Sequence, residues 1–224
     1  MTLADDPLLD GVPSRPMRVK GVRAPEQTSA AILAAAVHEF AQKGYGGARI
    51  DEIAKRSGAN KRMIYHYFGG KEALYLAALE SVYAGIRSAE AELHLTERDP
   101  VDGMRELARF TWHYFLKHPE FLSLLGTENL LKARHLKRST KILGMHSPLI
   151  EMLSEVLNRG ATQGLFRTGV DPVRLYITIA ALGFFYLSNR HTLSAIFSRD
   201  LGEKEELLAW EEHMTSVVLA YLRP

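Results

Sequence analysis

Apolar side chains recur at the spacing of an α-helix along most of this 224-residue chain. The first such segment covers residues 26–43, and the positions on its apolar face are Ile32, Leu33, Ala36, Val37 and Phe40. Residues three and four apart lie on the same side of a helix, so this segment is predicted to be amphipathic. Gly44 follows it and is suited to the left-handed conformation that often ends a helix. We therefore expect the first helix to end at residue 43.

Two short segments with apolar positions follow, and a glycine lies between them. They cover residues 50–57 and 61–68, and their main apolar positions are Ile50, Ile53, Ala54 and Ile64. Gly58 permits a left-handed turn between the segments, and Asn60 is a good N-cap for the second one. Two short helices joined by about three residues that include a glycine are typical of a helix-turn-helix.

The rest of the chain is also predicted to be helical, because no segment shows the apolar–polar alternation of a strand. The expected helices cover residues 71 to about 94, 101–117, 120–138, 147 to 160 or 164, 171–187 and 203–222. The predicted fold class is all-α, with an N-terminal three-helix helix-turn-helix domain followed by a larger helical domain. We expect a flexible basic arm over residues 1–25, the first domain over 26–72 and the second over 73–224.

The segment 171–187 is apolar on almost every side. A membrane-spanning helix needs about 20 apolar residues, so this segment is too short to cross a membrane. A helix that is apolar all round is instead buried on every side, here against a second subunit. The first ten residues carry three aspartates and no basic region, so no signal peptide is predicted. The absence of cysteine fits a cytoplasmic protein.

Positive charge is concentrated near the N-terminus. Residues 15–71 contain eleven Lys and Arg residues against four Asp and Glu residues, whereas the whole chain has a net charge of only +2. A basic segment on a near-neutral body is suited to a polyanionic partner such as nucleic acid. A solvated basic face explains the same charges equally well, so charge alone does not decide between the two interpretations.

The stretch ANKRMIYHYFGGKEAL, residues 59–74, brings basic and aromatic residues together on the second helix of the motif. A helix-turn-helix places this helix in the major groove of DNA, with its first residues next to the base edges. Asn60, Lys61 and Arg62 occupy that end. The two cations are able to bind guanine or to neutralise phosphates, so these residues are candidate DNA contacts.

Ring-bearing residues and a lysine complete the predicted DNA-binding surface. The ring residues that can reach phosphates, sugars or thymine methyl groups are Tyr65, His66 and Tyr67. Ile64 and Phe68 are expected to point inward on this short helix, so Tyr65 and Tyr67 cannot both be buried. Lys71 begins the next helix, where free backbone N–H groups favour an anion such as phosphate.

Residues 40–74 resemble the DNA-binding domain of the TetR family of transcriptional repressors. The matching positions are Phe40, Gly44-Tyr45, Ile53-Ala54, Gly58, Tyr65, Tyr67-Phe68, Lys71-Glu72 and Leu74. These separated elements agree in order and spacing, and the resemblance covers roughly residues 26–75. The family usually has Thr or Ser where this chain has Ala48 and Arg49. The resemblance therefore implies that Arg49 replaces a hydroxyl contact to phosphate with a charge.

The resemblance also implies how the second domain is organised. It implies a homodimer formed through the last two long helices, about residues 171–188 and 203–222, and a pocket for a small-molecule effector. The candidate pocket residues are Trp112, Phe115, Phe121, Leu125, Glu128, Asn129, Phe184 and Asn189. These residues combine apolar walls with a few polar groups, as ligand pockets do. Most of the aromatic ones are equally suited to an ordinary core.

We therefore expect a ligand-responsive repressor that binds a near-palindromic operator in double-stranded DNA as a homodimer and is released by a small-molecule effector. Two alternatives stay open, namely a constitutive DNA-binding protein without an effector and a carrier or enzyme that does not bind DNA. We expect no enzymatic activity and no cofactor, because the sequence lacks a Gly-rich phosphate loop and a G-x-S-x-G elbow. The histidines show no metal-ligand spacing, so no metal is predicted.

Overall fold

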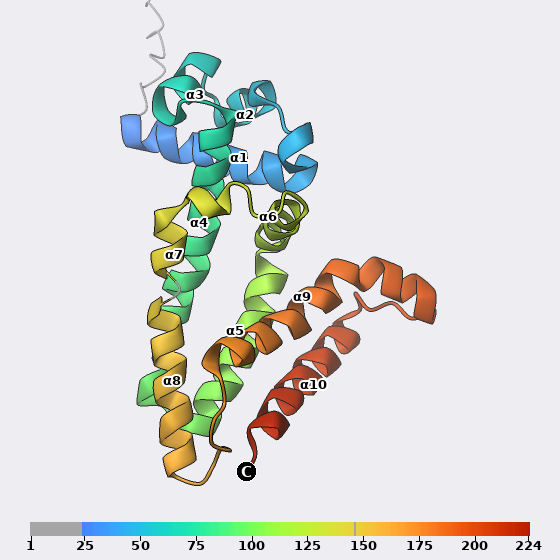
Figure 1. The fold of residues 1–224 in the computed structure, drawn as a ribbon. Helices are drawn as coiled ribbons and strands as arrows, with labels where there is room; N and C mark the ends of the chain where they lie inside the picture. Colours follow the sequence, from blue (N-terminus) through green and yellow to red (C-terminus); the bar gives the residue numbers. More distant parts are fainter. Residues whose placement is uncertain (1–23, 146) are drawn as a thin grey trace, which may run out of the picture.

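The computed structural model describes residues 24–145 and 147–224, and this part of the chain is helical throughout, with no strand. Figure 1 shows a helical head above an elongated helical body. The head helices are α1 (Pro25–Gly47), α2 (Ile50–Ser57) and α3 (Lys61–Phe68). The body contains α4 (Lys71–Ala91), η1 (Leu95–Glu97), α5 (Pro100–Lys117), α6 (Pro119–Leu130), η2 (Leu136–Arg138), α7 (Thr140–Met145), α8 (Ser147–Thr162), α9 (Pro172–Phe197) and α10 (Lys204–Leu222). The all-α fold expected from the sequence is confirmed.

The helix α1 is kinked at Gly44, where φ is 64° and ψ is 174°. This conformation lies in the left-handed half of the backbone map, which glycine tolerates best. The chain then makes one more helical turn, and the amide of Ala48 donates to the carbonyl oxygen of Gly44 at 3.1 Å. The helix therefore does not end at residue 43 as predicted. The backbone changes direction at Gly44 and then continues as helix to Gly47. That change places Tyr45 against Tyr75 of α4, with ring centroids 5.0 Å apart.

The helices α2 and α3 begin and end at the residues that the sequence predicts. Gly58 has a φ of 69° and makes the turn between them. The Asn60 side chain caps α3 by accepting a hydrogen bond from the amide of Met63 at 3.0 Å. Ile53 and Ile64 are completely buried, and burial of each such side chain stabilises the fold by roughly 1.5–3 kcal/mol. Local capping and apolar packing therefore fix the angle at which α3 is presented.

The helix α4 belongs to both the head and the body (Figure 1). Its first half buries Leu74, Tyr75 and Leu79 in a core that also contains residues of α1, α2, α3 and α6. A second core lies where α5, α8, α9 and α10 meet, and Trp112 packs edge-on against Tyr186 there, with ring centroids 5.5 Å apart. Within the described ranges, no helix combines the length and apolar character required to cross a membrane.

One predicted helix, over residues 120–138, is wrong in its second half. The helix α6 ends at Leu130, and the next residues turn sharply, with positive φ at Lys132 and Ala133. The physical reason is the buried Glu128 carboxylate, whose Oε1 accepts hydrogen bonds from the amides of His135 at 2.6 Å and Leu136 at 2.9 Å. A continued helix could not bring those two amides back to Glu128, so a tertiary contact overrides the helical pattern.

Other helix boundaries also differ from the predicted ones. The helix α9 continues to Phe197, ten residues beyond the predicted end at 187, because the residues after 187 have no break before Ser198 adopts a φ of 50°. The helix α4 ends at Ala91 where about residue 94 was predicted, and α7 was not predicted as a separate element. Residues 1–23 of the expected basic arm lie outside the described residues.

Replacement of Gly44 by alanine is expected to lower the free energy of unfolding by about 1–3 kcal/mol, the usual cost of holding another residue in this backbone region. The added Cβ would approach no atom closer than 3.8 Å, so the loss arises from backbone strain and not from a clash. Urea denaturation followed by circular dichroism measures the change. Gly46→Ala is the matched control, because an added Cβ there has no neighbour within 4 Å. Equal destabilisation of both variants would contradict the special role of Gly44.

Candidate nucleic-acid interface

The outer side of α3 carries the residues that the sequence predicts for DNA binding. Lys61, Arg62 and His66 are exposed, and the Tyr65 side chain is 53% exposed although it is large and aromatic. Tyr67 is half-buried and packs against the apolar core that includes residues of α1, α2 and α4, so this tyrosine mainly stabilises the fold. The expectation that Tyr65 and Tyr67 are not both buried is confirmed. The arrangement leaves a cationic and aromatic surface free for a partner.

The start of α2 adds a second exposed cation next to α3. Arg49 precedes α2 and is exposed, and its backbone amide donates a hydrogen bond to the buried Glu39 carboxylate at 3.3 Å. Asp51 lies between the two cationic positions, with its oxygens 2.5 Å from Lys61 Nζ and 3.9 Å from Arg49 Nη2. Exposed ion pairs of this kind stabilise a fold by about 0–1 kcal/mol. Both cations can therefore exchange the carboxylate for a phosphate at little energetic cost.

Lys71 lies at the N-terminus of α4, directly after the bend at Gly69 and Gly70. Both glycines have positive φ, and the helix start has no side-chain cap. The Lys71 ammonium lies 5.1 Å from the centre of the Tyr45 ring, a cation–π contact that holds the lysine at this end of the helix. Uncapped N–H groups with a lysine beside them favour a bound anion.

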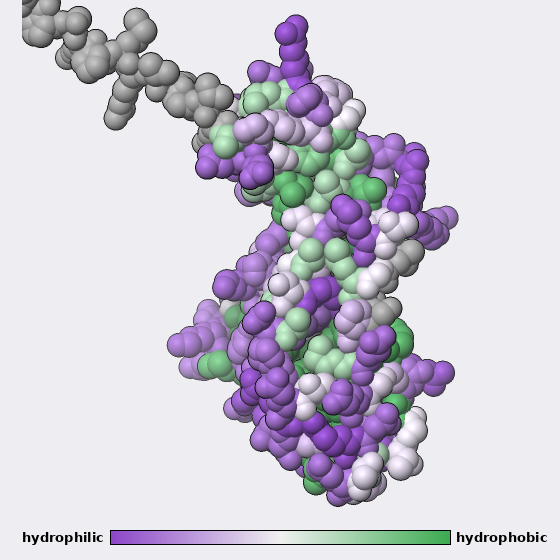
Figure 2. All heavy atoms as spheres, turned by 90° about the vertical axis from the view of Figure 1, so that its left-hand side faces the viewer, coloured by the Kyte–Doolittle hydropathy of each residue, from purple (hydrophilic) through white to green (hydrophobic). Residues whose placement is uncertain are grey.

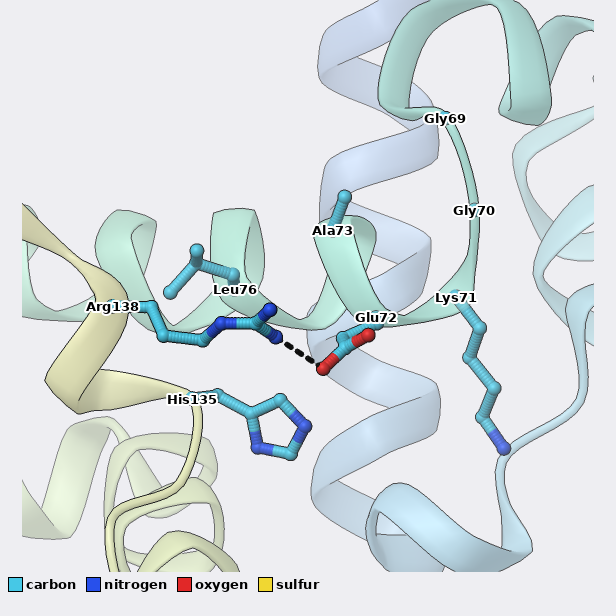
Figure 3. A pocket seen from close by; sticks show the side chains of 8 residues that line it. All are labelled: Gly69, Gly70, Lys71, Glu72, Ala73, Leu76, His135 and Arg138. Carbon is cyan, nitrogen blue, oxygen red and sulfur yellow. Dashed lines mark hydrogen bonds and ion pairs between the residues drawn. The ribbon is translucent and has the colours of Figure 1, made fainter.

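The same bend borders a hollow of about 450 Å³ on the body side, shown in Figure 3. Glu72 and Arg138 form an ion pair across it, with an N–O distance of 2.5 Å, and Arg134 lies 3.9 Å from the same carboxylate oxygen. In Figure 3 the Lys71 side chain points away from this pair, towards the other side of the bend. Lys71 is therefore not neutralised by Glu72.

Comparison with known proteins identifies both parts of the chain. A family profile described as "Bacterial regulatory proteins, tetR family" matches residues 32–78. A second profile, "Tetracyclin repressor-like, C-terminal domain", matches residues 100–218, which is more than half of the chain. The chain belongs to the TetR family. The resemblance expected from residues 40–74 is thus confirmed, and it extends over the body.

Named relatives agree with this family assignment. The "HTH-type transcriptional repressor NicS" of Pseudomonas putida is 39% identical to this TetR-family protein over 208 residues, which cover 92% of the chain and 98% of NicS. The "HTH-type transcriptional regulator RutR" of Escherichia coli is 26% identical over 205 residues, 92% of the chain and 95% of RutR. The crystal structure of SCO4942 from Streptomyces coelicolor superposes with a TM-score of 0.66 at 26% identity, covering 88% of this chain and 99% of that one. The protein is a DNA-binding transcriptional regulator.

A buried polar cluster links the head of this TetR-family protein to its body. Glu128 and His135 are each 1% exposed, and His135 Nδ1 lies 3.0 Å from Glu128 Oε2. The His135 ring contacts Tyr45 and Tyr75, with centroid distances of 4.7 Å and 4.8 Å. Burial, followed by the Glu128 charge, raises the pKa of the Tyr75 hydroxyl, which therefore stays neutral. The cluster connects Glu128 of α6, through His135 and Tyr45, to Lys71 at the DNA-binding end.

The sequence gives no signal for this cluster. Glu128 is predicted there as a pocket residue and His135 lies within the predicted helix 120–138, whereas the structure places both at the junction of α6, α1 and α4. Their contact depends on the unpredicted turn after α6, so helical periodicity could not reveal it.

The other predicted pocket residues of this TetR-family protein lie in several places. Trp112, Phe115 and Phe121 are buried, and the rings of Phe115 and Phe121 stack with centroids 5.8 Å apart. Phe121 also borders a hollow of about 460 Å³ between α1, α4, α5 and α6. The remaining positions are half-buried or exposed: Leu125, Phe184 and Asn189 are half-buried and Asn129 is exposed. Among the residues that the structure describes, no group of three His, Cys, Asp or Glu side chains is placed to hold a metal ion.

Asp51→Asn is expected to tighten DNA binding roughly threefold or more at low salt, because it removes a negative charge beside Lys61 and Arg49. Fluorescence anisotropy with a labelled duplex from upstream of the protein's own gene measures the change. Glu52→Gln is the control, since it removes a neighbouring exposed carboxylate that makes no ion pair with the described residues. Weaker binding by Asp51→Asn would show instead that Asp51 holds Lys61 in its DNA-binding position.

Proposed function

We propose that this TetR-family protein is a repressor that binds a near-palindromic operator as a homodimer and leaves it when a small-molecule effector binds the body. The observation that carries the proposal is the exposed cationic and aromatic side of α3 on a buried helix-turn-helix scaffold. In a homodimer, two such helices enter successive major grooves about 34–36 Å apart. We place the boundary between the DNA-binding and effector domains near residue 72, with the N-terminal arm before residue 26.

Each candidate residue has a role that its position supports. Lys61 and Arg62 begin α3 and are assigned to base edges or neighbouring phosphates, and Asn60 caps the helix and lies next to them. The phosphate contacts are assigned to Arg49, Tyr65, His66, Tyr67 and Lys71. Tyr67 contributes mainly by supporting His66, since their rings make an edge-on contact with centroids 5.2 Å apart.

The proposed dimer forms through α9 and α10. Large apolar side chains are exposed on one side of α9 at Val173, Ile177 and Phe185, and the last two are 57% and 60% exposed. The helix α10 adds Leu208, Val217 and Tyr221. Clusters of exposed apolar residues favour a protein partner, and a twofold axis brings the same two helices of each chain together. Figure 2 views the opposite part of the molecule, over α4, α7 and α8, where hydrophilic residues dominate.

Release by an effector is explained by the shared helix α4 and the cluster at its start. A ligand that prefers a body conformation with a shifted α4 moves Lys71 and, through His135 and Tyr45, the whole head. Operator affinity then falls by linkage between the two binding equilibria. A constitutive DNA-binding protein is the alternative, and it would keep its operator affinity with every ligand. We do not propose a carrier or enzyme, because the named relatives are transcriptional regulators.

Lys61→Ala and Tyr65→Ala are each expected to weaken operator binding at least about fivefold, because each removes a contact of roughly 1–3 kcal/mol. Anisotropy across a salt series measures the affinity. For Lys61→Ala, the slope of log affinity against log salt concentration is also expected to become shallower by about one, because one fewer phosphate is neutralised. Lys117→Ala removes an exposed cation at the C-terminal end of α5, outside α1, α2 and α3, and is the control. Parent-like binding by both head variants would contradict the assigned interface.

Ile177→Glu is expected to convert the dimer to a monomer, since it places a charge in the middle of the apolar face of α9. Size-exclusion chromatography with light scattering reports the mass. The control is Leu130→Glu at the end of α6, because Leu130 is 86% exposed and lies outside α9 and α10. An Ile177→Glu protein that remains a dimer would contradict an interface on α9.

A further inference from the structure

A buried ion pair lies in the body half of α4, far along the helix from Lys71. Arg87 Nη1 lies 2.8 Å from Glu90 Oε2, and the two side chains are only 8% and 1% exposed. Arg87 Nη2 donates a hydrogen bond to the hydroxyl of Tyr176 on α9, and the guanidinium lies 5.1 Å from the centre of that ring. Burial of two charges is unfavourable unless the remaining polar atoms also find partners.

The remaining polar atoms of this pair do not find such partners within the described residues. Nε and Nη1 of Arg87 and both carboxylate oxygens of Glu90 are buried without a hydrogen bond. Nη1 and Oε2 are close enough for ionic attraction, but they lack hydrogen-bond geometry. Buried polar groups in native proteins are nearly all hydrogen-bonded, so several unpaired ones side by side point to a missing partner.

A hollow of about 290 Å³ lies directly beside the pair, between α4 and the segment formed by α7 and α8. Its α4 side is lined by Arg87, Ser88, Glu90 and Ala91. The opposite side is lined by Met145, Pro148, Leu149 and Met152. Apolar walls that face a few polar groups are the usual composition of a small-molecule site, and methionines adapt readily to a ligand's shape.

We propose that this hollow binds the effector and that the effector is a small monocarboxylate with an apolar body. Its carboxylate pairs with Nε and Nη1 of Arg87, since a guanidinium matches a carboxylate with two parallel hydrogen bonds. Its apolar body lies against Met145, Leu149 and Met152. The identification of this ligand as the effector rests on the proposed function. The binding site itself rests only on the geometry of α4, α7 and α8.

Glu90 gives the site a way to accept an added negative charge. Burial, opposed by the Arg87 charge, raises the pKa of Glu90 to about 7. The groups that act on it are Arg87 on the same helix, Tyr114 on α5 and Tyr176 on α9, and burial keeps both tyrosines neutral by raising their pKa. The wall from α7 and α8 presents Met145, Pro148, Leu149 and Met152. When a ligand carboxylate replaces Glu90 beside Arg87, Glu90 takes up a proton and the net charge of the site is unchanged.

Proton uptake fixes the sign of the pH dependence. Below pH 7 Glu90 is mostly protonated before the ligand arrives, so binding carries no extra cost. Above pH 7 a proton must be taken from solution, and the dissociation constant rises by up to about tenfold for each pH unit. The ligand carboxylate is ionised on both sides of this range, because free carboxyl groups titrate near pH 4.

The first experiment compares monocarboxylates with their primary amides on the full-length protein. The pairs are benzoate and benzamide, phenylacetate and phenylacetamide, and hexanoate and hexanamide. At least one acid is expected to raise the melting temperature where its amide does not, because a ligand that binds only the folded state stabilises it. Acids that are no better than their amides throughout the panel would overturn the proposal.

The best acid is then titrated by calorimetry at about pH 6.5 and about pH 8. The dissociation constant of the parent is expected to rise by about tenfold over this interval, whereas Glu90→Gln removes the proton uptake and with it the pH dependence. Arg87→Met is expected to weaken binding at least about tenfold, and Arg87→Lys, which keeps the charge but loses the planar fork, to give an intermediate affinity. Arg105→Met, on the exposed side of α5, is the matched control with parent affinity. Arg87 variants that bind as tightly as the parent would overturn the proposal.

Operator binding by the same variants separates this site from the proposed function. Parent-like affinity of ligand-free Arg87→Met for DNA shows that the variant is folded. A carboxylate that binds through Arg87 but leaves operator affinity unchanged would support the site and contradict release by an effector. A ligand that releases DNA equally well from the parent and from Arg87→Met would leave the repressor function intact and overturn this site.

Discussion

The structure depends on the continuous burial of one face of α4. Leu74, Tyr75 and Leu79 anchor its first half in the head core, and Ile86 continues the same apolar face into the body. Because close packing along this face resists bending of the helix, a displacement of the body half of α4 is transmitted towards its start. Lys71, to which we assign a phosphate contact, is the first residue of that helix. The helix α4 therefore joins the body directly to the DNA-binding head.

The head separates the residues that stabilise it from those that we assign to DNA binding. Among the residues of α3, only Ile64 is completely buried, and Asn60 caps the helix through its own side chain. Lys61, Arg62 and Tyr65 consequently carry little of the folding energy, so the surface that we assign to operator recognition can vary in sequence without loss of the scaffold. The carboxylate of Asp51 pairs with two of the cations, and exposed ion pairs of this kind are weak enough to exchange for another anion.

The local features of the head could be predicted from sequence, and the non-local ones could not. Gly58, Asn60 and Ile64 act within a few residues of their own positions, so their spacing specified α2 and α3 correctly. The turn after α6 arises because Glu128 captures two backbone amides further along the chain, and no periodicity records that contact. Arg87 and Tyr176 are 89 residues apart, so their pairing is visible only in the fold. Aromatic residues were weak evidence for a pocket, because Trp112 and Phe115 are needed in the core.

Two buried carboxylates in this protein illustrate how hydrogen bonding distinguishes a structural group from a binding group. Glu128 accepts bonds from two amides and faces the His135 imidazole, so both of its oxygens have hydrogen-bond partners within the chain. Among the described residues, Glu90 has one close cation and no hydrogen bond to either oxygen, and burial raises its pKa to about 7. The first arrangement is rigid because any change would strip a charge of its partners. Glu90, in the second arrangement, gains or loses its proton near neutral pH. When Glu90 is protonated, Arg87 is available to pair with another anion. Because Glu90 and Arg87 both lie on α4, a change in the groups that pair with them can be transmitted along this helix to the DNA-binding head.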